Sequence, residues 1–221
     1  MQEQLFLLMA LSGTAFPSVT PSGALCDPRD ALRHATGSLH EAVDAGMPLS
    51  RPSVTLADYH EHLCLLRDWV QSLRTLSEAL AADRLDAEAA ALDADIRACE
   101  RLLGRASPAP RVLPDESTAA VPTTAEYRAA LAWGVAYVIE GSRLGGQVLH
   151  RRLAGPLAPH PLDYLQGAGA QTGSRWCAFL DTLRAALDTP VRVQAACDGA
   201  VLAFGRLLQL NRMAAAQEQP A

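Results

Sequence analysis

Residues 136–153, AYVIEGSRLGGQVLHRRL, decide the fold. The segment has the character of a helix, yet Gly141, Gly145 and Gly146 interrupt it, and Gly134 stands just before it. A glycine in a helix interior costs about 0.5–1 kcal/mol relative to alanine. The chain has 41 alanines, so these glycines need a physical reason. Gly134, Gly141 and Gly145 share nearly one face of the helix, so we expect bare backbone there, packed against another helix or against a flat ligand.

Capping residues and prolines set the bounds of this helix and of its neighbours. Thr123-Thr-Ala-Glu126 is a capping box that predicts the start of the glycine-bearing helix, which runs to about Leu153. Asp27 followed by Pro28 predicts the start of a first helix that ends near Gly46. Further helices are expected over about 55–82, 86–104, 174–188 and 190–215, with a proline-rich linker over 106–122 and a Gly/Pro-rich loop over 155–173.

The composition predicts an all-α fold. Alanine and leucine together supply 75 of the 221 residues, whereas isoleucine occurs twice and aromatic residues make up 5%. Good helix formers therefore dominate, which disfavours a β-sandwich or a β-barrel. With 49% hydrophobic residues the chain can bury a full core. We expect one helical bundle domain over 27–215, between an irregular tail at 1–26 and a short tail at 216–221.

Charge and cysteine content limit the classes of function. The net charge is −5 and all 19 basic residues are arginine, so we expect no nucleic-acid partner. Five cysteines lie far apart without metal-binding spacing, as suits reduced thiols in the cytoplasm. The apolar run at 5–11 is too short to span a membrane, and Gln2-Glu3-Gln4 precedes it in place of a positive region. An irregular extension or an over-long start is therefore favoured over a signal peptide.

His40 is the histidine best placed to bind a ligand. It lies in the first expected helix, with Asp44 four residues further on, where helical side chains can touch. A metal-binding histidine usually donates its other N–H to a carboxylate, which the pair would satisfy. The alternative is an ordinary structural or surface histidine. His34 lies on a different face from His40, and His60 and His62 are expected on the outer face of the second helix.

Four stretches together carry a resemblance to a known family. The segment ALRHATGSLHEAVD at 31–44 resembles the N-terminal helix of bacterial heme oxygenases, and the segment at 136–153 resembles their distal helix, including EGSxLG at 140–145. The likeness covers about residues 28–212 in order, and the phytochrome-associated and iron-acquisition branches are the nearest. GGQVL at 145–149 is similar to the mammalian branch as well, and GSRWCAFLDTL at 173–183 and AVLAFGRLLQL at 200–210 resemble the last two helices of the bacterial branch.

The resemblance implies heme b as both cofactor and substrate, held between the first and fourth helices. His40 would be the proximal iron ligand, with Asp44 as its hydrogen-bond partner. Gly141, Ser142 and Gly145 would form the distal catalytic wall, where backbone approaches the bound O₂. With electrons from an external reductase or ferredoxin, the ring would open to biliverdin, CO and Fe²⁺. The resemblance thus implies a monomeric enzyme whose partners are heme and an electron-donor protein.

Further residues are expected at the heme on the same grounds. The family's propionate-binding lysines have no lysine counterpart here, so Arg33, Arg151 and Arg152 are the candidates, because arginine can clamp a carboxylate. Arg151 and Arg152 are equally compatible with an ordinary basic helix C-terminus. The final candidates are Gly146, with Tyr137 and Phe204, whose rings suit either the pocket or the core.

The sequence departs from the pattern of the heme oxygenase family at two positions. Ser142 stands where mammalian relatives carry an aspartate, so proton delivery must use water held by backbone and by Ser142 or Arg143. Asp44 is one methylene shorter than the usual glutamate.

A heme carrier or sensor on the same fold is the main alternative function. A diiron oxidase needs a Glu-x-x-His motif, which the sequence lacks, and a thiaminase-like enzyme needs an activated cysteine, for which Cys64 and Cys177 have no evident base.

Overall fold

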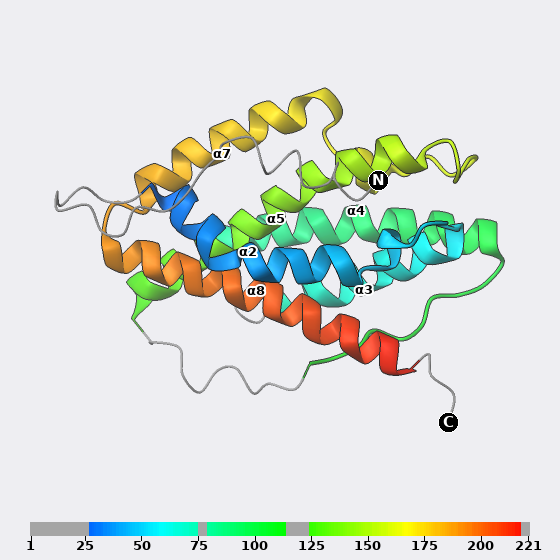
Figure 1. Cartoon of the computed structure of the whole chain (residues 1–221), viewed down its shortest axis with the longest axis horizontal. Helices are drawn as coiled ribbons and strands as arrows, with labels where there is room; N and C mark the ends of the chain where they lie inside the picture. Colours follow the sequence, from blue (N-terminus) through cyan, green and yellow to red (C-terminus); the bar gives the residue numbers. More distant parts are fainter. Residues whose placement is uncertain (1–26, 75–78, 114–123, 218–221) are drawn as a thin grey trace.

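The computed structural model describes residues 27–74, 79–113 and 124–217, with their side chains except at 79–82. All regular structure in these ranges is helical, which confirms the predicted all-α fold (Figure 1). The expected tail at 1–26, the residue Thr123 and residues 218–221 lie outside the described ranges. The elements are α2 Pro28–Gly46, η1 Pro48–Ser50, α3 Leu56–Arg74, α4 Ala79–Leu103, α5 Ala125–Leu153, α6 Asp163–Gln166, η3 Gly169–Gln171, α7 Thr172–Ala186 and α8 Pro190–Gln217.

Local capping explains where the two helices of main interest begin. The Asp27 carboxylate accepts a hydrogen bond from the Arg29 amide at 2.8 Å, and Pro28 occupies the first turn of α2, as predicted. At α5 the cap is Thr124, whose hydroxyl accepts from the Tyr127 amide at 3.3 Å. In each helix a side chain therefore accepts a hydrogen bond from one of the free N–H groups of the first turn.

Several expected boundaries differ from the structure. α3 is described to Arg74 and α4 from Ala79, whereas the expected boundary lay between residues 82 and 86, and residues 75–78 lie outside the described ranges. Alanine and leucine suit the end of one helix as well as the start of the next, so the stretch carried no stop signal. The expected loop at 155–173 contains α6 and η3, and α8 continues two residues beyond 215 to Gln217.

α8 is the common support of the helices that carry the candidate site. It packs against both α5 and α2, and it also contacts α3, where the Trp69 indole donates to the Ala203 carbonyl at 2.8 Å. A Cβ at Gly134 would lie 1.8 Å from the Ala196 carbonyl oxygen, and one at Gly199 would lie 2.1 Å from the Leu131 carbonyl oxygen. The backbones of α5 and α8 therefore meet directly, so close helix packing is the reason for glycine at 134.

His60 and His62 are buried, at 3% and 6% exposure, so the expectation that they lie on an outer face is wrong. α4, α8 and η1 pack against α3 and bury most of its residues. His60 Nε2 contacts Ser107 Oγ at 2.8 Å. His62 Nδ1 has no hydrogen-bond partner among the described residues, and its burial lowers the pKa of His62 to about 4.

Within the described ranges, no helix combines the length and the apolar character needed to cross a membrane.

Candidate functional site

His40 and Asp44 form the pair that the sequence predicts. His40 Nδ1 lies 3.0 Å from Asp44 Oδ2, and both side chains are 37% exposed. The hydrogen bond with Asp44 raises the pKa of His40, although partial burial opposes the shift. In the neutral ring, Nδ1–H donates to the carboxylate, which leaves the lone pair on Nε2. Nε2 has no hydrogen-bond partner among the described residues, so it is available to a ligand.

Phe204, from α8, lies beside this imidazole. The two ring centroids are 5.8 Å apart and the rings are tilted by 55°. Phe204 is 8% exposed, so it belongs to the core and also borders the candidate ligand atom. Packing on one side and the Asp44 carboxylate on the other restrict the orientation of the His40 ring.

The four glycines of α5 have different surroundings. Gly134 belongs to the crossing with α8, and Gly146 backs onto α6, where a Cβ would lie 3.3 Å from the Leu165 carbonyl oxygen. Among the described residues, a Cβ at Gly145 would meet nothing within 4 Å, and one at Gly141 would meet only the ring of Trp176, at 3.9 Å. Close packing therefore accounts for Gly134 and Gly146, whereas packing among the described residues does not explain Gly141 and Gly145.

Two observations relate α2 to α5 along their lengths. Burial raises the pKa of Tyr137 on α5, and the nearby guanidinium groups of Arg29 and, more weakly, Arg33 on α2 oppose that shift. Beyond the C-terminal end of α2, the Leu49 carbonyl of η1 accepts a hydrogen bond from Arg152 at the end of α5. The two helices therefore run in the same direction, as Figure 1 also shows.

This alignment brings His40 near the level of Gly145. His40 lies seven residues after Arg33 and eleven after Arg29, and the same steps from Tyr137 on α5 reach Leu144 and Val148. Gly145 lies within this stretch, and Gly141 lies one turn before Gly145. We call the set formed by His40, Asp44, Phe204, Gly141 and Gly145 the candidate site.

The arginines expected at heme propionates do not form one cluster. Arg33 lies near Tyr137, whereas Arg152 is exposed at the other end of α5 and donates to the Leu49 carbonyl. Fifteen residues, about 22 Å of helix, separate the two levels. Arg151 is exposed beside Arg152. The propionates of one heme lie on one edge, so these arginines are alternatives to one another.

Ser142 and Arg143 differ in what they can contribute to a site. Ser142 is exposed, and its hydroxyl donates to the Ile139 carbonyl at 2.8 Å. Arg143 pairs with Glu88 of α4 at 2.9 Å and with Glu140 at 3.2 Å. Arg143 lies two residues, about 200°, round the helix from Gly141. Its ion pairs hold the back of α5 against α4, which disfavours the hypothesis that Arg143 supports proton delivery.

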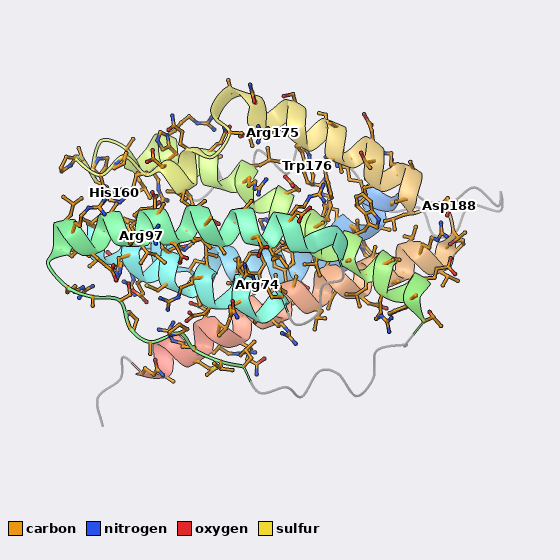
Figure 2. All side chains as sticks on the ribbon, turned by 180° about the vertical axis from the view of Figure 1, so that it is seen from behind. Arg74, Arg97, His160, Arg175, Trp176 and Asp188 are labelled. Atoms are coloured by element: carbon orange, nitrogen blue, oxygen red, sulfur yellow. The ribbon has the colours of Figure 1, made fainter. Side chains whose placement is uncertain are left out.

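Trp176 is the site residue that sequence reasoning missed. It lies on the side of α7 that faces α5 (Figure 2), with its ring 5.4 Å from that of Tyr137. It stacks on Phe179, with ring centroids 5.7 Å apart. The available signal was the spacing of Trp176 and Phe179, three residues apart, which puts both rings on one face of a helix.

The buried thiols have neighbours that the sequence did not reveal. Cys64 Sγ lies 3.8 Å from His60 Nε2, and Cys99 Sγ lies 3.4 Å from His160 Nε2. Burial raises the pKa of Cys64 and raises that of Cys99 to about 12. The thiolate is the nucleophilic form, so neither thiol is activated by its histidine. In the part of the chain that the structure describes, no three His, Cys, Asp or Glu side chains are grouped to hold a metal ion.

Comparison with known proteins does not assign a family. A scan against protein-family models and a search of curated proteins find no match to the chain. The motif residues and the geometry of the candidate site are therefore the features that indicate a function.

Proposed function

We propose that the protein is a heme oxygenase that binds heme at the candidate site and opens its ring. The observation that supports this most is His40, whose Nε2 is unpartnered among the described residues while Nδ1 is held by Asp44. The alignment of α2 with α5 puts His40 near the level of Gly145, whose lack of a side chain is not required by packing among the described residues. A free imidazole nitrogen on one helix and bare backbone at a similar level on another would suit a flat ligand held between the two helices.

The residues present fit heme by their chemistry. His40, with the Asp44 carboxylate behind its imidazole, would be able to bind a heme iron, which needs few ligands from the protein. Bare backbone at Gly145 leaves room for a flat ring. When bound, heme supplies the iron at which O₂ is reduced and the ring that is opened to biliverdin, CO and Fe²⁺.

The chain's own residues position the substrate. Asp44 holds the proton on His40 Nδ1 and so keeps Nε2 in the form that can bind iron. Phe204 limits rotation of the imidazole, and Gly145 leaves space for heme. Ser142 offers an exposed hydroxyl through which ordered water can pass protons. The electrons come from a separate donor protein.

Arg33 is the favoured anchor for a heme propionate. It shares the level of Tyr137 and lies on α2, seven residues before His40. Arg152 is already engaged with the Leu49 carbonyl. A guanidinium can hold a carboxylate through two parallel hydrogen bonds, which suits a chain that has no lysine.

A hemin turnover assay tests the proposal. The protein is loaded with hemin and supplied with ascorbate or with a ferredoxin system under air, and the Soret band is followed. Loss of the band together with the appearance of biliverdin absorption is the expected result. A Soret band that persists with both donors would contradict the enzyme and favour the alternative, a heme carrier or sensor.

Substitution of the proposed ligand provides the second test. His40→Ala is expected to abolish the axial-imidazole spectrum of bound ferric heme, because Nε2 is removed. His34→Ala is the matched control on α2, since residue 34 lies about 240° round the helix from residue 40. An unchanged imidazole spectrum in the His40 variant would disprove the assignment.

A further inference from the structure

The two glycines of the candidate site differ in what lies in front of them. At Gly145 the described residues leave the space open, because none of them would lie within 4 Å of a Cβ there. At Gly141 the ring of Trp176 is adjacent, with Cη2 and Cζ3 at 3.9 and 4.0 Å from the Cβ position. The space along this face of α5 is therefore open at one glycine and bounded at the other by an indole.

The indole is held in place from two helices. Tyr137 of α5 lies on one side, with ring centroids 5.4 Å apart, and Phe179 of α7 stacks against it at 5.7 Å. Phe179 is 5% exposed and lies under the Arg84 guanidinium, 5.6 Å from its ring centre. Aromatic contacts of this kind restrict the rotation of a large ring, so Trp176 forms a firm boundary.

We propose that Trp176 is a specificity-determining residue of the candidate site, an inference that rests on the proposed heme oxygenase function. Its indole limits how far a flat macrocycle extends over α5 on the Gly141 side. The meso carbon that is oxidised depends on how the macrocycle is placed and rotated in its own plane. Trp176 therefore selects the biliverdin isomer, and it also contributes apolar contact to porphyrin binding.

Matched aromatic substitutions separate this role from general packing. Trp176→Phe and Trp133→Phe are the same exchange at two half-buried tryptophans that both contact Phe179. Trp133 is not among the neighbours of the Gly141 or Gly145 positions. Trp176→Ala provides the stronger change, and Trp176→Phe keeps an aromatic ring on α7 should the alanine variant fold poorly. Circular dichroism and thermal melting check the fold of each variant.

Titrations with two porphyrins measure binding, and the ratio of biliverdin isomers measures which meso carbon is oxidised. Hemin and metal-free protoporphyrin IX are titrated into the apoprotein, and the biliverdin isomers formed from hemin are resolved by chromatography. Trp176→Ala is expected to weaken binding of both porphyrins by about tenfold, because a buried aromatic contact is lost and does not depend on iron. Trp176→Phe is expected to change the isomer ratio, and Trp133→Phe to change neither affinity nor ratio.

The outcomes distinguish this inference from the function on which it rests. If the wild-type protein degrades hemin and both Trp176 variants keep its porphyrin affinity and its isomer ratio, only the role of Trp176 is overturned. If the wild-type protein binds protoporphyrin but does not degrade hemin, the oxygenase proposal is overturned. Weaker protoporphyrin binding by the Trp176 variants would in that case still support Trp176 as a wall of a porphyrin site. Failure of the wild-type protein to bind either porphyrin would overturn both.

Discussion

At the scale of single residues, Gly145 most directly separates a requirement of the fold from a requirement of the ligand. It lies inside α5, where alanine would be the more stable choice, and a Cβ there would meet no atom of the described residues within 4 Å. Packing within the described residues thus gives no reason for glycine at 145, as it gives none at Gly37 of α2. What distinguishes Gly145 is its place in the glycine motif of α5, so the proposed heme site predicts that the ligand needs this space.

The variant Gly145→Ala is therefore expected to have opposite effects on stability and on binding. The apoprotein should gain about 0.5–1 kcal/mol in its free energy of unfolding, because alanine favours the helix and meets no clash. Hemin affinity should fall, because the methyl group occupies the ligand's space. Urea denaturation and hemin titration measure the two effects. A stabilised variant that binds hemin as tightly as the wild type would show that heme does not lie against Gly145.

The sequence predicts contacts within one helix better than contacts between helices. The contact of His40 with Asp44 follows from a spacing of four residues on α2 and is found at 3.0 Å. The contact of Trp176 with Gly141 joins α7 to α5. It depends on how two helices pack, which no local spacing encodes. The same limit applies to Arg33 and Arg152, whose separation appears only once α2 and α5 are aligned.

At the scale of the helices, the crossing of α5 and α8 explains why the glycine pattern was ambiguous. Gly134 and Gly145 lie on nearly the same face of one helix, yet one meets backbone and the other meets open space. The spacing of the glycines shows which face of α5 lacks side chains. It does not show at which residue the neighbouring helix stops packing against that face. Both readings of the glycines therefore apply, each to a different part of α5.

Substitution of Gly134 should damage the fold itself. A Cβ there would lie 1.8 Å from the Ala196 carbonyl oxygen, so Gly134→Ala must push α5 away from α8. The expected loss of stability is about 3 kcal/mol or more, at the upper end of overpacking changes, because the obstacle is backbone. Gly37→Ala on α2 is the control, since a Cβ at Gly37 meets no described residue within 4 Å and should be stabilising. Equal unfolding midpoints for the two variants would contradict the crossing.

At the scale of the whole molecule, composition predicts the class of the fold but not its interior. An alanine- and leucine-rich chain without many β-branched residues becomes all-α, as observed. The same composition gives little indication of which helix is innermost. α3 carries two histidines and appeared partly exposed from its sequence, but it lies between α4, α8 and η1. Its burial has a consequence for the stability of the entire domain.

The buried His62 should make the fold sensitive to mild acid. Burial lowers the pKa of His62 to about 4, whereas the ordinary value, expected in the unfolded chain, is 6.5. Between these values the unfolded chain binds the additional proton, so the free energy of unfolding falls as the pH drops from about 6.5 to about 4. The loss due to this one group is about 3 kcal/mol at the acid end.

His62→Leu removes both the titrating group and the unpartnered Nδ1, so it is expected to flatten this part of the stability curve. At pH 8 the variant should be at least as stable as the wild type, because a buried polar atom without a partner costs about 1–3 kcal/mol. Its advantage should then widen as the pH is lowered towards 4. The carboxylates titrate in both proteins, so the difference between two series of urea denaturation curves isolates His62. Parallel curves for the two proteins from pH 8 to pH 4.5 would show that His62 is not buried in the neutral form.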